Sequence, residues 1–381
     1  MNKNKKTVFV GVSGGVDSSV SAAVLKDQGY NVVGVFIRTW TPDFIECTWR
    51  SERRDAMRVC AHLGIPFLEC DAEAAYKNGV ADYMIEEYKN GRTPNPDVMC
   101  NREVKFGVFW NFAKSHGADF IATGHYAVCK NSQEVQPQTD PRGCTSKDIF
   151  ILNKSPDPSK DQSYFLWTLT NDDLAHTLFP IGHLQKTDVR ILAKKYKLPT
   201  AVKKDSQGVC FLGPLDMKDF LKHYIKSEKG NVLNIKGEVI GNHEGAVLFT
   251  LGERHGFNIT KKGEFDKPLY IISKDIKNNT VTVSADLNIF KEVQPQTGPR
   301  GCTSNENIIH ITNTNWISSI LEKDKGYTAQ IRYHGELLNC ILDIKEDNKA
   351  QINFEKNILV DSGQSIVIYD GDICLGGGIV E

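Results

Sequence analysis

A segment rich in glycine and serine, GVSGGVDSS (Gly11 to Ser19), constrains the fold of this chain more than any other part of it. An apolar run at 7–12 precedes it and predicts a buried strand, and a helical pattern at 18–28 follows it. Glycines let a backbone turn sharply, and the start of a helix offers unpaired N–H groups to an anion. The segment has neither the Gly-Lys-Ser/Thr of a Walker loop nor the G-x-G-x-x-G of a dinucleotide site. It therefore predicts a phosphate site of another kind, and an ordinary glycine-rich turn is the less favoured interpretation.

Strands and helices alternate through the first half of the chain. Further strands are predicted by apolar runs at 31–37, 65–70 and 118–124, and a helix is predicted at 53–63, where the apolar residues share one face. This alternation is typical of an α/β fold in which helices cover both faces of a parallel sheet. The N-terminal part of the chain is therefore expected to be a doubly wound parallel sheet.

The character of the sequence changes near Asp205, where short β-rich runs punctuated by glycine and asparagine begin. After about Ile308, alternating strand patterns dominate and predict a small β-barrel or sandwich. A length of 381 residues suggests two or three domains. We expect three: a catalytic α/β domain at 1–204, a small central β-rich domain at 205–290 and a C-terminal β-barrel at 305–381.

One sequence occurs twice: EVQPQTDPRGCTS at 134–146 returns as EVQPQTGPRGCTS at 292–304. Two copies so far apart are too few for a repeat architecture. Proline, glycine and polar residues make each copy typical of a surface loop, where an insertion costs little stability. We therefore expect two tolerated insertions, and a pair of binding loops that carry Cys144 and Cys302 is the alternative.

The charges of the chain balance, with 46 lysines and arginines against 47 aspartates and glutamates and a net charge of -1. Such a balance argues against unspecific coating of nucleic acid. The run at 186–204, however, holds seven basic residues and one acidic residue, which indicates either a solvated helix face or a surface that contacts phosphates. No apolar stretch is long enough to cross a bilayer and no signal peptide is evident, so we expect a cytoplasmic protein without a membrane partner.

Two of the ten cysteines lie in polar, basic sequence, where a thiol can react. Cys100, in GRTPNPDVMCNREVKFG, precedes a predicted helix, whose dipole together with Arg102 and Lys105 would lower the pKa of the thiol. Two prolines hold the preceding loop extended and present Asp97 near that thiol. Cys210, in KKDSQGVCF, follows two lysines. No C-x-x-C pair indicates a zinc site, and the cysteines in apolar runs are expected to be structural. These are Cys60, Cys70, Cys129, Cys340 and Cys374.

The glycine- and serine-rich segment resembles the pyrophosphate loop of the N-type ATP pyrophosphatases, which activate a carbonyl by adenylation and release pyrophosphate. Longer motifs make nearly the whole chain similar to the tRNA-specific 2-thiouridylase family. They stand in the family's order: SGGVDSS, GRTPNPDVMCNREVKF, ATGHYA, KDQSYFLW, DSQGVCF, IRYHGEL and YDGDICLGGGIV. The chain departs from the family pattern at Ile37, where the family often has methionine, and in NILVDSGQS around Gln364, which lacks the family's proline.

The resemblance implies an adenine nucleotide alpha hydrolase-like catalytic domain and an enzyme, a tRNA-uridine 2-sulfurtransferase. It would thiolate the wobble uridine (U34) of tRNA. ATP would adenylate the C2 carbonyl oxygen, and a cysteine persulfide would supply the sulfur, giving 2-thiouridine, AMP and pyrophosphate. The implied cofactor is ATP with magnesium, the metal lying near Asp17 without a cluster of protein ligands. The implied partners are the anticodon stem-loop of tRNA and a persulfide sulfur donor, such as a cysteine desulfurase or a sulfur-carrier protein.

The resemblance also assigns roles residue by residue. The ATP-binding residues would be Gly11, Val12, Ser13, Gly14, Gly15, Val16, Asp17, Ser18, Ile37 and Gly124. The target base and the tRNA would contact Asn95, Pro96, Asp97, His125, Lys160, Asp161, Gln162, Arg332, Tyr333 and Gln364. Cys100, Cys210 and Asp97 would be catalytic, with the aspartate as a general acid or base. The two cysteines would form a transient disulfide if Cys100 attacks the persulfide, whereas the persulfide itself attacks the base in the other route.

Two other functions stay open on the sequence alone. An ATP pyrophosphatase that amidates a small molecule would need neither Cys100 nor Cys210. A non-catalytic RNA-binding protein would keep the fold and bind RNA without turning over ATP. The intact loop and the two cysteines favour the sulfurtransferase.

Overall fold

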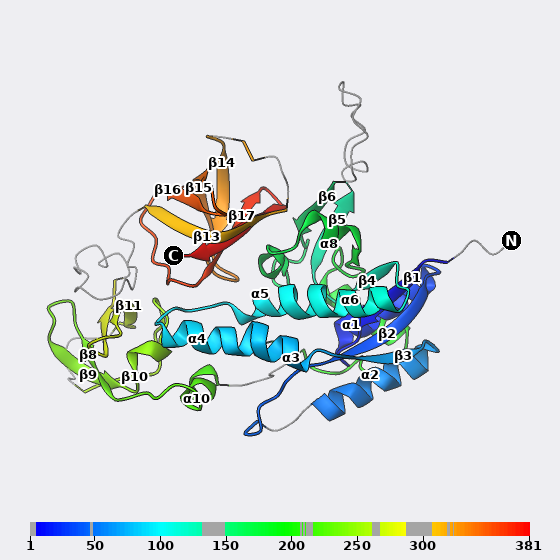
Figure 1. Ribbon diagram of the computed structural model, residues 1–381, viewed down its shortest axis with the longest axis horizontal. Coiled ribbons are helices and arrows are strands. Elements are labelled where there is room, and N and C mark those ends of the chain that lie inside the picture. The colour runs from blue at the N-terminus through cyan, green and yellow to red at the C-terminus, as the bar shows by residue number, and fades with distance from the viewer. Residues whose placement is uncertain are drawn as a thin grey trace.

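Three sheets carry the fold of the chain, as the computed structural model shows (Figure 1). The structure describes residues 5–45, 49–131, 149–205, 208, 210, 216–260, 267–286, 307–317, 321–322 and 324–381. Both copies of the repeated sequence lie outside these residues. Within them, no helix has the length and apolar character that a membrane span requires.

The first sheet is parallel throughout and has the strand order β3-β2-β1-β4-β7. Its strands are β1 (Thr7–Gly11), β2 (Asn31–Arg38), β3 (Phe67–Asp71), β4 (Phe120–Ala122) and β7 (Thr177–Leu178). Val8 and Val10 enter one apolar cluster and Phe9 enters another, because successive side chains of a strand point to opposite faces. The predicted parallel sheet is confirmed, although the sequence pattern does not predict β7.

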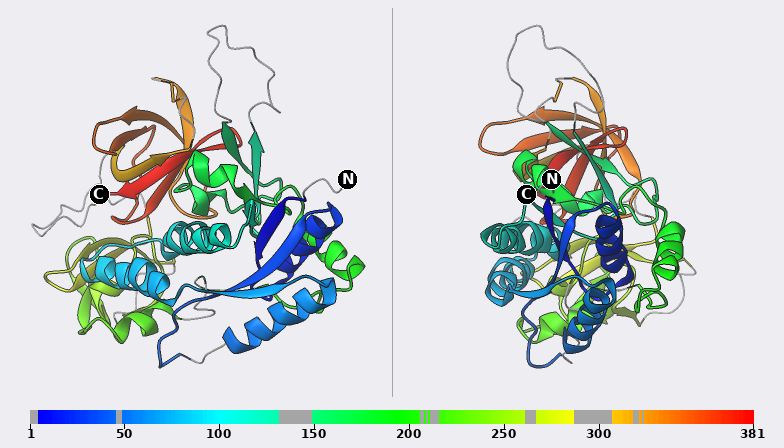
Figure 2. Two further views of the ribbon diagram at one scale, coloured as in Figure 1. Left: turned by 45° about the vertical axis from the view of Figure 1, so that its right-hand side comes forward. Right: turned by 90° about the vertical axis from the view of Figure 1, so that its right-hand side faces the viewer.

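Helices cover both faces of this sheet (Figure 2). The helices α1 (Val16–Asp27), α2 (Trp49–Leu63) and α9 (Lys186–Lys195) bury apolar residues in the cluster that holds Val8. Two longer helical runs pack on the other face, and each has a π-helical segment at its centre. The first run consists of α3 (Glu73–Tyr76), η1 (Lys77–Asp82) and α4 (Tyr83–Lys89). The second consists of α5 (Pro96–Cys100), η2 (Asn101–Val108) and α6 (Phe109–Ser115).

A second sheet forms the central region, after helix α10 (Met217–Lys222). Its strand order is β10-β9-β8-β12-β11, and every pair is antiparallel except β8 with β12. The strands are β8 (Gly230–Leu233), β9 (Val239–His243), β10 (Phe257–Ile259), β11 (Tyr270–Asp275) and β12 (Thr280–Ser284). The predicted β-rich region is thus confirmed, while the predicted domain limits stay predictions.

Six strands close a β-barrel in the described C-terminal part, since β13 pairs with β16 on one side and with β18 on the other. The strands are β13 (Ile308–Trp316), β14 (Gly326–Gln330), β15 (Leu337–Ile344), β16 (Ala350–Phe354), β17 (Ser365–Asp370) and β18 (Ile373–Val380). A hairpin from the N-terminal region, β5 (Ala127–Asn131) and β6 (Phe150–Lys154), extends this sheet because β6 pairs with β18. The barrel is confirmed, and its link to the hairpin is a feature that the sequence pattern does not predict.

A buried ion pair joins the N-terminal, central and C-terminal regions. The side chains of Lys274, on β11, and Asp361, before β17, are each 2% exposed, and Nζ lies 2.6 Å from Oδ2. The same Oδ2 accepts hydrogen bonds from the Thr93 hydroxyl at 2.8 Å and from the backbone N–H of Leu251 at 3.2 Å. Thr93 follows α4, so one carboxylate oxygen fixes all three regions to one another.

Candidate active site

The glycine- and serine-rich loop lies where β1 ends and α1 begins. The strands β2 and β3 lie on one side of β1 and β4 and β7 on the other, which makes this edge the switch point where open α/β sheets bind ligands. Gly14 has a φ of 73°, and a Cβ atom there would lie 2.6 Å from the carbonyl oxygen of Glu52, so the position requires glycine. Val12 and Val16 are buried, and they can therefore offer only backbone atoms to a ligand.

Other predicted ATP residues border the same loop. Ile37, at the end of β2, packs against Gly11 in β1. Gly124, after β4, lies against the start of α1, where a Cβ atom would be 2.8 Å from the backbone nitrogen of Ser18. The hydroxyls of Ser13 and Ser18 are 3.3 Å apart. The structure thus brings these residues to one edge of the sheet, and their contacts with ATP stay a prediction.

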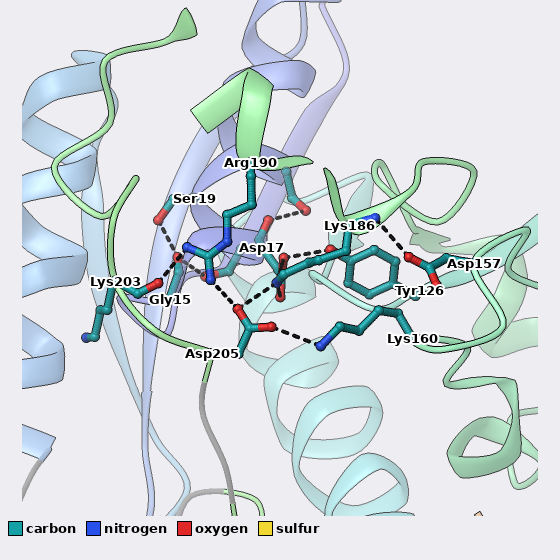
Figure 3. Close-up of polar contacts among 12 residues, drawn as sticks. Gly15, Asp17, Ser19, Tyr126, Asp157, Lys160, Lys186, Arg190, Lys203 and Asp205 are labelled. Atoms are coloured by element: carbon teal, nitrogen blue, oxygen red, sulfur yellow. Dashed lines mark hydrogen bonds and ion pairs between the residues drawn. The ribbon is translucent and has the colours of Figure 1, made fainter. Parts of the chain in front are cut away.

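Three cations reach toward the loop from other parts of the chain, and we call Lys160, Lys186 and Arg190 the loop-facing cations (Figure 3). The ammonium of Lys186 contacts both carboxylate oxygens of Asp17, at 2.7 and 2.8 Å, and Asp205 at 3.0 Å. Asp205 also pairs with Lys160 at 2.9 Å and with Arg190. Burial opposes ionisation of Asp205, but the hydrogen bonds from Lys160 and Lys186 lower its pKa to about 2. The two carboxylates therefore hold the cations together at the mouth of the loop.

The sequence shows the basic run at 186–204 but does not show in which direction its side chains point. Lys186 and Arg190 turn toward the loop, whereas the Nζ of Lys203 lies 2.8 Å from Asp55 on α2. Tyr126, which sequence reasoning misses, donates its hydroxyl to the carboxylate of Asp17 at 2.8 Å (Figure 3). The motif ATGHYA contains this tyrosine, but nothing local places it opposite the loop. Part of the run therefore borders the predicted phosphate site.

Cys100 and Cys210 lie far apart in the sequence and meet in the structure. Both belong to one apolar cluster, and the two thiols lie close enough to act on each other's ionisation. The backbone N–H of Cys210 donates to Oδ1 of Asp97 at 3.0 Å, and its carbonyl accepts from the Tyr76 hydroxyl at 2.7 Å. Cys100 is buried and Cys210 is half-buried, and neither is in a disulfide. If one of the two carries a persulfide sulfur, the other can attack it, so that a disulfide forms and hydrosulfide leaves.

The prediction that the start of a helix activates Cys100 is wrong. The helix begins at Pro96, where the side chain of Asn95 caps it by accepting from the N–H of Val98 at 3.2 Å, and Cys100 lies inside the helical run. Burial raises the pKa of Cys100 well above its usual value. The pKa of Cys210 falls instead to about 7, because the hydrogen bond from Cys100 and the charge of Lys105 outweigh burial. Cys210 is therefore the thiol that ionises near neutral pH.

Charged groups surround the thiol pair unequally. Arg102 is exposed and pairs with Glu103 at 2.7 Å, so it does not reach the thiols. Lys105 is half-buried, and its Nζ lies 3.4 Å from Nε2 of His125. Burial raises the pKa of Asp97, which brings proton uptake by this carboxyl closer to neutral pH. The pair therefore has one cation and one proton-exchanging group beside it.

Comparison with known proteins covers the chain from end to end. Three family models match in order: a tRNA methyl transferase HUP domain at 6–214, a tRNA methyl transferase PRC-barrel domain at 218–285 and an aminomethyltransferase beta-barrel domain at 306–380. The tRNA-specific 2-thiouridylase MnmA of Pseudomonas putida (strain GB-1) is 40% identical over 381 residues, which are 99% of this chain and 95% of that protein. The chain belongs to the tRNA-specific 2-thiouridylase family. Proteins of the same name from Listeria innocua serovar 6a (39% identical, 100% of this chain and 96% of that protein) and Geobacillus thermodenitrificans (40%, 100% and 96%) agree.

In this 2-thiouridylase family member, several predicted tRNA contacts already have partners within the protein. His125 is buried, and its Nδ1 lies 2.7 Å from the hydroxyl of Thr123. Asp161 accepts from the backbone N–H of Ser155 at 2.8 Å, and Gln162 accepts from a backbone N–H beside β5 at 3.0 Å. Each side chain therefore has a structural role, and its contact with tRNA stays a prediction.

The predicted tRNA residues of the C-terminal region gather near a cavity of about 330 Å³, to which all three regions contribute. Arg332 and Gln364 line it and donate to backbone carbonyls of the neighbouring regions, at 2.7 and 3.0 Å. Tyr333 is 38% exposed, and its ring centroid lies 4.4 Å from that of Phe165. An exposed aromatic ring beside a cation can stack on an unpaired base. Arg332 and Gln364 thus lie at one junction, and Tyr333 follows Arg332 in the chain with its ring against Phe165.

Proposed function

We propose that this chain replaces the C2 carbonyl oxygen of uridine at the wobble position of tRNA with sulfur and consumes ATP to do so. The observation that carries the proposal is the contact between the thiols of Cys100 and Cys210 beside the carboxyl of Asp97. Amidation of a small molecule needs no such thiol pair, and neither does the methyl transfer named in two of the family descriptions. The name of the full-length relatives supports sulfur chemistry.

The loop after β1 would bind the phosphates of ATP. The start of α1 offers backbone N–H groups, and the loop-facing cations offer three positive charges. Adenylation would join AMP to the carbonyl oxygen of the uridine and release pyrophosphate, which turns a poor leaving group into a good one. Cations aimed at the departing phosphates would stabilise the charge that develops on them.

Magnesium would arrive with ATP. Among the residues that the structure describes, no group of three or more His, Cys, Asp or Glu side chains could hold a metal ion. The phosphates would therefore supply ligands of their own, as is usual for this metal. Asp17 fits as a protein ligand because its carboxylate lies at the loop. In the structure, Lys186 supplies the positive charge that faces this carboxylate.

Cys210 would carry the sulfur as a persulfide, since it is half-buried and ionises near neutral pH. In one route Cys100 attacks the inner sulfur, hydrosulfide leaves and attacks C2, and a Cys100–Cys210 disulfide remains for a reductant to open. In the other route the outer sulfur of the persulfide attacks C2 directly and AMP leaves. Cys100 then attacks the inner sulfur, which breaks the S–S bond, releases 2-thiouridine and leaves the same disulfide. In both routes the C2–O bond breaks and AMP leaves with the oxygen, while Asp97 exchanges a proton beside the base.

The partners follow from this chemistry. The anticodon stem-loop of tRNA would bind across the junction that holds Arg332 and Gln364 and would contact Tyr333. A cysteine desulfurase or a sulfur-carrier protein would load Cys210. We place the reaction in the cytoplasm, where both partners would be available.

Incubation of tRNA with the protein, ATP and a persulfide donor should produce 2-thiouridine at the wobble position. Mass spectrometry of the digested nucleosides detects it as a replacement of oxygen by sulfur, and omission of ATP is the control. Methylated uridine in place of 2-thiouridine, or unmodified tRNA, would overturn the proposal.

The variant Lys186→Met should bind ATP roughly ten- to a hundredfold more weakly, because a hydrogen bond to a charged group contributes about 1.5–3 kcal/mol. The substitution also removes the ammonium partner of Asp17, and the carboxylate left behind repels phosphates. Isothermal titration with ATP measures the affinity. Lys194→Met is the matched control, since Lys194 lies on the same helix and is exposed. Equal affinities for the two variants would contradict the placement of the phosphates.

A further inference from the structure

A π-helical turn follows Cys100 directly and carries Lys105. At its end the N–H of Phe109 bonds to the carbonyl of Val104, five residues back. In an α-helix, residues five apart point about 140° away from each other. In a π-helix the fifth residue comes round close to the starting direction, because the hydrogen bonds span five residues. The turn therefore aims Lys105 to the side of the helix on which Cys100 lies.

The ammonium of Lys105 ends among the groups of the thiol pair. Its charge favours ionisation of Cys210, and its Nζ lies 3.4 Å from Nε2 of His125. Because an ammonium can only donate, Nε2 accepts and the ring hydrogen sits on Nδ1, which donates to the hydroxyl of Thr123 at 2.7 Å. Burial and the charge of Lys105 hold the pKa of His125 well below its usual value, so the ring stays neutral. The neutral histidine thus fixes the direction of the lysine without competing for its charge.

The ionisable groups that act on Cys210 come from three elements. Cys100, from α5, favours ionisation of its sulfur, and the carboxyl of Asp97, also from α5, opposes ionisation. Tyr76, from α3, bonds to its carbonyl oxygen and not to its sulfur. Lys105, from η2, is the cation among the described groups that act on this sulfur.

We propose that Lys105 is a positioning residue that holds the sulfur of Cys210 in its ionised form, and that the π-helical turn exists to aim it there. The purpose rests on the proposed function, because only an ionised Cys210 attacks a donor persulfide efficiently. In that step the Cys210 thiolate bonds to the outer sulfur of the donor, the donor's S–S bond breaks, and the donor leaves as a thiolate.

Alkylation by iodoacetamide against pH tests the proposal in the full-length protein without ATP or tRNA. Only a thiolate reacts, so the rate rises as pH rises through the pKa of the thiol. The tryptic peptide at 205–218 contains Cys210 as its only cysteine, and mass spectrometry follows its labelling. We expect an inflection near pH 7 in the unaltered protein. In Lys105→Met we expect it to move up by about one to three pH units, and Lys105→Arg should keep it low.

Two further variants separate the charge of Lys105 from general effects on the helix. Arg102→Met removes an exposed cation of the same segment and should leave the inflection in place. Gly107→Ala should raise it, because a Cβ atom there would lie 2.9 Å from the carbonyl oxygen of Arg102 and the turn must shift. An inflection that stays near pH 7 in Lys105→Met, or that rises equally in Lys105→Arg, overturns the role of the charge. An unchanged inflection in Gly107→Ala overturns the role of the turn.

The alkylation result is independent of thiolation. If tRNA stays unmodified while the inflection moves, the proposed function fails and the role of Lys105 stands. If tRNA is thiolated while the inflection does not move, the reverse holds.

Discussion

Replacement of Cys210 by serine is expected to lower the rate of tRNA thiolation roughly a thousandfold or more, because a hydroxyl cannot carry a persulfide. The loss should be confined to sulfur transfer. Asp97 and Tyr76 hold the backbone of Cys210 and not its side chain, so the segment keeps its place. The first-turnover release of pyrophosphate should therefore persist when tRNA and ATP are present. Nucleoside mass spectrometry and a pyrophosphate assay on the same reaction measure the two steps separately.

The matched control is Cys129→Ser, which alters another half-buried thiol, on β5. This variant should thiolate tRNA at the unaltered rate. Cys100→Ser should stop multiple turnover, since it removes the attacking thiol. Full thiolation by Cys210→Ser, or an equal loss in Cys129→Ser, would show that the sulfur travels by another path.

The variant Lys274→Met should lower the free energy of unfolding by about 3–5 kcal/mol, the usual effect of leaving one partner of a buried ion pair behind. The carboxylate of Asp361 would stay buried with two hydrogen-bond donors, the hydroxyl of Thr93 and the N–H of Leu251. Urea unfolding measures the loss. Hydrogen exchange in the three regions shows whether they still open together, which a single midpoint cannot show.

Two controls bracket this effect. Lys349→Met breaks an exposed pair with Glu381 and should change stability by less than about 0.5 kcal/mol. The double variant Lys274→Met with Asp361→Leu leaves no buried charge and should recover much of the loss. A Lys274→Met protein as stable as Lys349→Met would mean that water reaches Asp361.

Local features of the site could be predicted from the sequence because short-range geometry determines them. The strand, the glycine turn and the helix start around Gly14 are neighbours in the chain. The start of α5 also depends on neighbouring residues, since Asn95 followed by Pro96 is typical of a helix cap and first helical residue. The two prolines of that segment are also typical of an extended loop, which predicts a helix start after Cys100 and therefore an ionised Cys100 thiol.

Long-range features could not be predicted from the residues. The contact of Cys210 with Cys100 depends on how the segment after Asp205 returns across α5, and only the family resemblance indicated it. The direction of Lys186 depends on where α9 packs against α1. The five-residue span of the hydrogen bonds in η2 depends on packing along the whole helix.

The hairpin that extends the barrel limits how this protein can be divided. Family models separate the chain into three stretches, the last at 306–380. Yet Cys374 on β18 pairs with Leu152 on β6, and both enter the apolar cluster of the N-terminal region. A chain shortened to the first two stretches would uncover a free strand edge and an apolar face on what remains, which invites aggregation. The C-terminal barrel thus supplies part of the hydrophobic core of the catalytic region. The enzyme therefore has to be purified, tested and altered as one piece.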